Sequence, residues 1–494
     1  MSGLVIYKYY LLIMTLQKRI LARLDIKGSR LIKGVRFEGL RVIGDPHLAA
    51  INYTNFGVDE ILYIDAVASL YGRNSLYELL RQTSHDVFIP ITAGGGIRSV
   101  HDAASLLAVG ADKVAINTAA HQNPGLISQI SKTFGSQSVV ASVQARKIGN
   151  EHWEAMAEAG RERTGKSVIE WIEFVQDNGA GEILLTSVDQ DGTCLGPDND
   201  LIISAGSVAK IPLIYGGGLS KDQEIIDCLK QPNIMAVSIA TALHKQIINV
   251  QGLKDNIKSS SPELPIRNPV LTHPRLTKPQ LKPKLIGIID YNMGNQQSLI
   301  NAFQKLGYQT LLSNTINKLE DCDLLALPGV GSFPKAMSNL TDLKLDKFLA
   351  NWINHDRPLI GICLGMQLLF QQGDEFEFTK GLGFIDGDVR LLSSLHLNID
   401  TLKLPHIGWN NLISTRMSAN LSSFEGISQY FVHSYVASNV KESEIIFNCE
   451  YDDVTFVAGV RKKSIAGFQF HPERSGLKGL ELLQSMCYQL LERV

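Results

Sequence analysis

The sequence predicts two α/β domains in series, a (β/α)8 barrel over residues 16–250 and an open α/β sheet over residues 285–494. Three observations lead to this prediction. The first part repeats itself at a spacing of about 122 residues, and short β-branched runs alternate with amphipathic stretches in both parts. A proline-rich stretch, residues 251–284, separates the two parts, and residues 1–15 are expected to form an N-terminal extension.

The repeat in the first part relates two halves of four βα units each. Gly94–Ile97 recurs as Gly216–Leu219, and Gly57–Leu62 recurs as Gly179–Leu184, both 122 residues later. Parallel βα units repeated in this way predict a barrel that is built from two half-barrels. An open doubly wound sheet is the alternative arrangement of the same units.

Individual units of the first part follow the expected order of strand and helix. Val87–Thr92 predicts a strand, and Val100–Val109 predicts the helix after it. Lys113–Ile116 and Pro124–Phe134 form the next such pair. Because a strand needs a long crossover to reach a parallel neighbour, this alternation indicates a parallel sheet.

The two flanking segments are expected to lie outside the domains. Residues 251–284 hold six of the 17 prolines, and such a chain stays extended, so we expect a linker there. The apolar run Leu4–Met14 is interrupted by Lys8, and no small-residue cleavage site follows it. A signal peptide is therefore not expected.

The composition excludes several classes of protein. Lys and Arg number 47 against 49 Asp and Glu, and this balance argues against a general nucleic-acid binder. The chain holds no apolar run of about 18 residues, so no membrane span is expected. The six cysteines form no CxxC pair, which argues against a disulfide framework or a zinc site. We expect a cytoplasmic protein that uses no metal and no cofactor.

A candidate nucleophile stands in the second part. Buried parallel strands are predicted over Leu285–Asp290, Leu324–Leu327 and Pro358–Ile362. Cys363 follows the third strand, flanked by two glycines in the pattern G-x-C-x-G, the thiol version of the nucleophile elbow. The N-terminus of the helix behind the sulfur favours the thiolate.

A histidine and a carboxylate that suit this thiol occur about 100 residues later. His471 and Glu473 directly follow another predicted strand. His471 can take the thiol proton, and Glu473 can hold the imidazole in the required tautomer. A buried structural thiol is the alternative for Cys363, but three separate elements that stand at strand ends argue against it.

A glycine-rich turn that holds Val330 and Gly331 follows the second predicted strand. Its backbone N–H groups can complete an oxyanion hole with that of Leu364. The second part resembles a class I glutamine amidotransferase domain of the Cys-His-Glu type over nearly its whole length. The resemblance implies that Gly365 and Gln367 line a pocket for L-glutamine, and that a glutamyl thioester forms and ammonia is released.

The glycine runs of the first part are candidate phosphate sites. Gly94–Gly96 and Gly216–Gly218 each follow a strand and can offer backbone N–H groups to a phosphate. Asn117-Thr118 and Ala240-Thr241 stand at the next strand ends and can add donors. A flexible loop is the alternative for one such run. Two runs at the same offset predict two equivalent sites that hold a long bis-phosphate.

The first part resembles the cyclase half of imidazole glycerol phosphate synthase from about Leu16 to Gln246. In that family, ammonia and a bis-phosphorylated ribotide give imidazole glycerol phosphate and aminoimidazole carboxamide ribotide. The stretches that carry the likeness to the family's two parts include Lys18–Ile20, Ile32–Gly34, Gly94–Arg98, Ile116–Thr118, Leu185–Ser187, Gly408–Asn410 and Tyr430–His433. The implied substrate-binding residues are Lys33, Gly96, Asn117, Thr118, Gln144, Thr186, Asp191, Gly192, Gly218, Ala240 and Thr241.

Asp25 ends the predicted strand Ile20–Leu24 and should point into the mouth of the barrel, where a carboxylate can move protons. A helix N-cap is the alternative role for this aspartate. Its repeat partner is Gln144, where the family has a second catalytic Asp, and an amide cannot transfer a proton at neutral pH. The sequence therefore leaves open two alternatives, ammonia delivery to a partner enzyme that amidates a surface sugar, and a barrel that only binds and regulates the glutaminase.

Arg19, Glu60, Lys113 and Glu182 stand just before barrel strands and should meet at the bottom of the barrel. They are expected to form a stabilising layer of salt bridges, and the resemblance implies a gate for ammonia there. The glutaminase domain is expected to dock on this face within the same chain.

Gly160–Ser167 fits the P-loop pattern in full, but we expect no nucleotide there. A P-loop follows a buried strand, and the preceding Glu154–Ala159 is rich in Glu and Ala and lacks β-branched residues.

Overall fold

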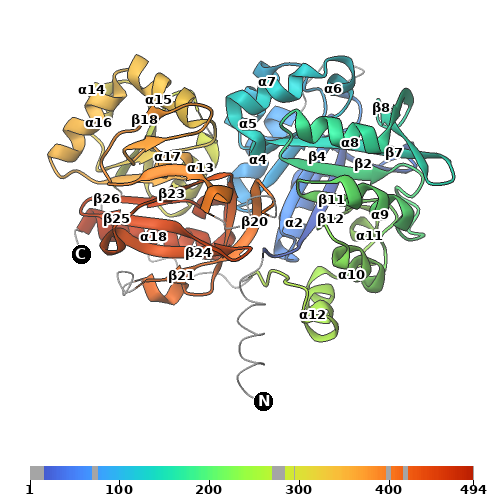
Figure 1. Cartoon of the computed structure of the whole chain (residues 1–494). Coiled ribbons are helices and arrows are strands. Elements are labelled where there is room, and N and C mark those ends of the chain that lie inside the picture. Colours follow the sequence, from blue (N-terminus) through green and yellow to red (C-terminus); the bar gives the residue numbers. More distant parts are fainter. Residues whose placement is uncertain are drawn as a thin grey trace. The chain divides into compact units, whose positions relative to one another are not determined.

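A computed structural model of the chain describes residues 16–68, 76–269, 284–293, 295–395, 402–415 and 421–492. The chain divides into two compact units, formed mainly by residues 17–269 and by residues 270–494 (Figure 1). The expected extension, residues 1–15, lies outside the described residues, as do residues 270–283 of the expected linker.

Within the described residues, the first unit contains a closed barrel of eight parallel strands, as predicted. Each strand pairs with the next, and β12 pairs with β1, so the open-sheet alternative is wrong. The strands are β1 (Arg19–Lys27), β4 (Glu60–Asp65), β5 (Ile91–Gly94), β6 (Lys113–Ile116), β7 (Val139–Gly149), β10 (Glu182–Ser187), β11 (Leu213–Gly216) and β12 (Ile234–Ile239).

Helices connect successive barrel strands and carry one buried face each, as Leu76, Leu79, Leu80 and Thr83 of α4 illustrate. No helix in the described part of the chain has the length and apolar character needed to cross a membrane. The helices are α2 (Pro46–Asn55), α4 (Leu76–Asp86), α5 (Val100–Ala108), α6 (Thr118–Gln122), α7 (Gly125–Phe134), α8 (Val168–Asp177), α9 (Asn199–Val208), α10 (Asp222–Lys230), α11 (Thr241–His244) and α12 (Val250–Ser260).

Two hairpin extensions follow repeat-related strands, β2 (Arg30–Val35) with β3 (Glu38–Gly44) after β1, and β8 (His152–Ala157) with β9 (Glu162–Ser167) after β7. The judgement that the segment before the P-loop-like sequence is not a strand was wrong, because pairing and burial in β8 override its weak β-propensity. The P-loop-like segment itself lies largely in β9 and pairs antiparallel with β8, so it forms no phosphate-binding loop.

The predicted start of the linker at residue 251 was also wrong. Residues 250–260 form α12, which buries Val250, Leu253, Lys254 and Ile257 on one face. The chain stays with the barrel unit as far as residue 269. This boundary was missed because the prolines, which begin only after α12, dominated the composition of the stretch.

The second unit is built on one large sheet with a parallel core. The parallel strands, in spatial order, are β14 (Gln309–Ser313), β13 (Leu285–Ile289), β15 (Leu324–Leu327), β16 (Leu359–Ile362) and β26 (Ile465–Phe468). The remaining strands are β17 (Gln372–Gly373), β18 (Thr379–Lys380), β19 (Asp388–Leu391), β21 (Ile413–Ser414), β23 (Tyr435–Ser438), β24 (Ile445–Tyr451) and β25 (Val454–Lys462) in the same sheet, with β20 (His406–Asn411) and β22 (Ser428–His433) as a separate pair.

The helices of this unit are α13 (Gln296–Lys305), α14 (Ile316–Leu319), α15 (Phe333–Asp342), α16 (Leu345–Asn354), α17 (Leu364–Gln367) and α18 (Gly476–Glu492). The strands β16 and β26 are direct neighbours in the sheet although about 100 residues separate them. The residues that follow these two strands therefore meet at the same edge of the sheet.

Candidate active sites

Cys363 stands in a sharp turn between β16 and α17, with φ of 51° and ψ of −110°. The turn after β15 lies directly against it. A Cβ on Gly365 would come within 1.9 Å of the carbonyl oxygen of Leu327, and a Cβ on Gly329 within 2.3 Å of the Gly365 nitrogen. Both glycines are required because backbone meets backbone here. The structure thus supports the predicted elbow.

The expected oxyanion donors come from these two turns. Val330 and Gly331 follow Gly329 on the first turn, and Leu364 opens α17 on the second, where a Cβ on Gly329 would come within 2.7 Å of its Cα. The binding of an oxyanion by these N–H groups remains a prediction.

His471 lies next to the thiol, as predicted. Its Nδ1 is 2.7 Å from Oε1 of Glu473, and both side chains are buried. Nε2 has no hydrogen-bond partner among the described residues. Burial disfavours a charged imidazole, but Glu473 and Cys363 outweigh burial and raise the pKa of His471 well above its usual value. The arrangement favours a charged imidazolium beside the sulfur of Cys363.

Gln469 was missed by the sequence analysis. This fully buried side chain donates from Nε2 to the sulfur of Cys363 at 3.6 Å and accepts from Nε2 of Gln367 at 3.2 Å. Gln367 also donates to the carbonyl oxygen of Tyr435 at 2.8 Å. Gln469 therefore links the nucleophile to a residue of the expected glutamine pocket. Its position two residues before His471 is the signal that was overlooked.

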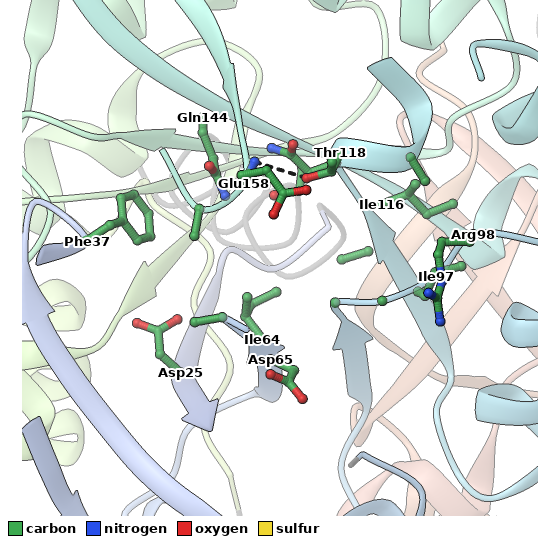
Figure 2. Close-up of a pocket in the computed structure, with 18 of the residues that line it drawn as sticks. Asp25, Phe37, Ile64, Asp65, Ile97, Arg98, Ile116, Thr118, Gln144 and Glu158 are labelled. Carbon is green, nitrogen blue, oxygen red and sulfur yellow. Dashed lines mark hydrogen bonds between the residues drawn. The ribbon is translucent and has the colours of Figure 1, made fainter. Parts of the chain in front are cut away.

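The first barrel cavity opens at the carboxyl ends of the strands and contains one expected phosphate site (Figure 2). Gly96, Asn117 and Thr118 line it together with Asp25 and Gln144. Oδ1 of Asn117 is buried and has no hydrogen-bond partner among the described residues. Unsatisfied buried polar atoms in a cavity suit a polar ligand.

A second cavity contains the other expected phosphate site. A Cβ on Gly218 would lie 1.9 Å from the carbonyl oxygen of Gly196, so only glycine fits there. Oγ1 of Thr241 is buried without a partner in the described part of the chain. The expected residues that line this cavity are Asp191, Gly192, Gly218, Ala240 and Thr241.

Charged side chains contact residues from the linings of both cavities. Lys33 lies 2.7 Å from Asp25 and 2.9 Å from Asp191, one from each lining. Arg23, which the sequence analysis missed, lies 2.8 Å from Asp25. Burial opposes the charge on Asp25, but Arg23 and Lys33 together hold its pKa well below the usual value. Asp25 is therefore a carboxylate at neutral pH.

Gln144 occupies the place that the repeat predicted. It is buried, it lines the same cavity as Asp25, and its Cα pairs with that of Thr186 across β7 and β10. Its Oε1 has no hydrogen-bond partner among the described residues. The amide can bind a ligand there but cannot exchange a proton with it.

The four charged residues at the start of the barrel strands meet as expected. Arg19 contacts Glu60 at 2.7 Å and also Glu182, while Lys113 lies 2.9 Å from Glu60 and 2.7 Å from Glu182. All four side chains are fully buried. This closed ring of ion pairs confirms the predicted salt-bridge layer, and its role as a gate for ammonia stays a proposal.

Within the described ranges, no group of three or more His, Cys, Asp or Glu side chains is placed to hold a metal ion.

Comparison with protein families gives one match in each part of the chain. Residues 19–249 match a family described as "Histidine biosynthesis protein", and residues 287–489 match "Glutamine amidotransferase class-I". The "Imidazole glycerol phosphate synthase subunit HisF" of Legionella pneumophila is 56% identical over 206 residues, 42% of this chain and 97% of that protein. The protein of the same name from Metallosphaera sedula is 40% identical over 247 residues, 50% of this chain and 98% of that protein.

Proposed function

The barrel part of this chain belongs to the HisF family of imidazole glycerol phosphate synthase, and since a class I glutamine amidotransferase domain follows it, we propose one bifunctional synthase. The chain is an enzyme of histidine biosynthesis with glutaminase and cyclase activities. In the proposal, glutamine supplies ammonia at Cys363, and the ammonia passes to a bis-phosphorylated ribotide in the barrel mouth. The products are imidazole glycerol phosphate and aminoimidazole carboxamide ribotide.

Glutamine hydrolysis follows from the geometry around Cys363. The thiolate attacks the side-chain amide carbon of glutamine, and N–H groups of the two adjoining turns stabilise the oxyanion. His471, charged and oriented by Glu473 at 2.7 Å, gives a proton to the departing ammonia. Water then hydrolyses the thioester, with His471 as the base, and glutamate leaves.

The two repeat-related cavities at the barrel mouth are the observation that carries the synthase proposal. Each is lined by glycines at a strand end and by small polar side chains, and Lys33 stands between them. A ligand with a phosphate at each end fits this arrangement. Asp25 serves as the base that removes protons during amination and ring closure, and Gln144 serves as a hydrogen-bonding residue.

Delivery of ammonia to a partner that amidates a surface sugar was the alternative suggested by Gln144. The two relatives named above are synthase subunits, and neither favours a sugar-amidating partner. Retention of both cavities and of Asp25 also supports a small bis-phosphorylated substrate.

Product formation by Cys363→Ala tests whether glutamine hydrolysis and ribotide conversion occur at two separate sites. With glutamine as nitrogen source, the variant should lose at least about 10³-fold in turnover, because the nucleophile is gone. With an ammonium salt it should match the unaltered chain, since the barrel site is intact. Equal loss with both nitrogen sources would contradict two separate sites.

A further inference from the structure

Arg23 stands at the floor of the barrel mouth. Alternate side chains of a strand share a face, so Arg19, Leu21, Arg23 and Asp25 of β1 all point into the barrel. Leu21 belongs to a buried apolar cluster inside the barrel, and Asp25 lines the first cavity. Arg23 therefore lies between the apolar interior and the mouth, and only 3% of it is exposed.

Two hydrogen bonds fix the guanidinium group of Arg23. Nε donates to Oδ1 of Asp25 at 2.8 Å, and Nη1 donates to Oγ1 of Thr186 at 3.1 Å. The group also lies 5.3 Å from the centre of the Phe37 ring. Nη2 makes no hydrogen bond to any described residue. Because a guanidinium is always protonated and only donates, Nη2 is available to an acceptor on a ligand.

Among the described residues, Arg23 is the one that lines both cavities. Small residues also line the two cavities, with Ser142 in the first and Gly216 and Ser238 in the second. Oγ of Ser238 is buried and has no partner in the described ranges. Because Arg23 belongs to both linings, a ligand that fills both cavities lies against it.

We propose that Arg23 determines ligand specificity by donating from Nη2 to a carbonyl or carboxamide oxygen midway between two phosphates. This inference rests on the proposed function, because it takes the ligand to be a bis-phosphorylated ribotide. Asp25 and Thr186 hold the guanidinium before the ligand arrives, so little side-chain entropy is lost on binding. A small monophosphate that fills only one cavity does not make this contact, so its affinity does not depend on Arg23.

The test measures the binding of two probes to the full chain by titration calorimetry, without glutamine or ammonium so that no turnover occurs. One probe is the formimino ribotide with two phosphates, and the other is glycerol 3-phosphate. Arg23→Met should weaken ribotide binding by at least about tenfold and change glycerol 3-phosphate binding by less than about twofold. Arg23→Lys keeps a cation beside Asp25 but lacks the planar fork, so it should show most of the same loss.

Arg146→Met is the matched control, because Arg146 of β7 donates to the carbonyl oxygen of Gly160 at 2.7 Å and lines neither cavity. It should bind both probes normally. Unchanged ribotide binding by Arg23→Met would overturn this inference and leave the proposed function standing. Equal losses for the two probes, or the same loss in Arg146→Met, would overturn it in favour of a general charge effect.

Failure of the unaltered chain to bind the ribotide would overturn the proposed function and this inference with it. Thermal unfolding checks that each variant is folded, and Arg23→Lys decides the outcome if Arg23→Met does not fold.

Discussion

Asp25 shows how the barrel sets the charge of one carboxyl group. Arg23 and Lys33 lie within 2.8 Å of its two oxygens, and their attraction outweighs the cost of burial. A lowered pKa means that Asp25 stays ionised from alkaline pH down to values below the usual range for aspartate. The residue therefore carries no proton at neutral pH, which is the state that a general base requires.

Asp25→Asn should reduce ammonium-dependent turnover by about 10² to 10⁴-fold, because the amide cannot accept the proton. Steady-state assays with an ammonium salt measure this loss. Asp189→Asn is the control, since Asp189 accepts from the Lys147 N–H at the same end of the barrel but lines neither cavity. Comparable losses in the two variants would contradict a specific role for Asp25.

Prediction from sequence worked at the residue scale where a residue ends a strand. Cys363 and His471 were placed in this way, and Asp25, which lies inside β1 two residues before its end, still lines the cavity at the barrel mouth. Arg23 and Gln469 were not placed in this way, because each is a polar side chain inside or beside a buried run. The contacts of such a side chain become visible only when strand pairing brings its neighbours together.

At the scale of elements, α12 shows how one helix is fixed to the barrel. Lys254 is fully buried and lies 2.6 Å from Asp59, which also faces Arg267 at 3.4 Å. Burial lowers the pKa of Lys254 to about 8, against the attraction of Asp59, so the lysine remains charged at neutral pH. The pattern of apolar residues in the sequence does not reveal this buried ion pair. The proline content, used alone, placed the start of the linker too early.

Lys254→Ala should lower the free energy of unfolding by about 3 kcal/mol, because Asp59 loses a buried partner. Urea unfolding of the full chain measures the change. Lys258→Ala on the same helix removes a more exposed pair with Asp255 at 3.7 Å and should cost less than about 0.5 kcal/mol. Similar costs for the two variants would show that the buried pair does not anchor the helix.

The elbow around Cys363 depends on the contact between two turns. Gly365→Ala would place a Cβ 1.9 Å from a carbonyl oxygen, so glutaminase activity should be lost and stability should fall by about 1–3 kcal/mol. Gly44→Ala is the control and should leave both properties unchanged, because Gly44, like Gly365, has no positive φ and no atom lies within 4 Å of its Cβ. Glutamate release and thermal unfolding measure both effects. Normal glutaminase activity in Gly365→Ala would contradict the required close approach.

At the scale of the whole molecule, the chain joins a HisF-like barrel to a class I glutamine amidotransferase domain. The repeat in the sequence predicted the closed barrel, and the residues of the two expected phosphate sites line two separate cavities, because equivalent residues in two half-barrels take equivalent places. It also exposed the departure at Gln144, which faces the same cavity as Asp25. The consequence of that amide for the reaction depends on the proton paths of a bound substrate, which the sequence alone does not give.

Turnover of the formimino ribotide with an ammonium salt is the decisive measurement of synthase activity, because it bypasses Cys363 and depends on the barrel alone. We expect imidazole glycerol phosphate and aminoimidazole carboxamide ribotide to form in equal amounts, with Asp25 sufficient and Gln144 tolerated. Absence of both products, in a chain that still releases glutamate from glutamine, would contradict the proposed synthase function.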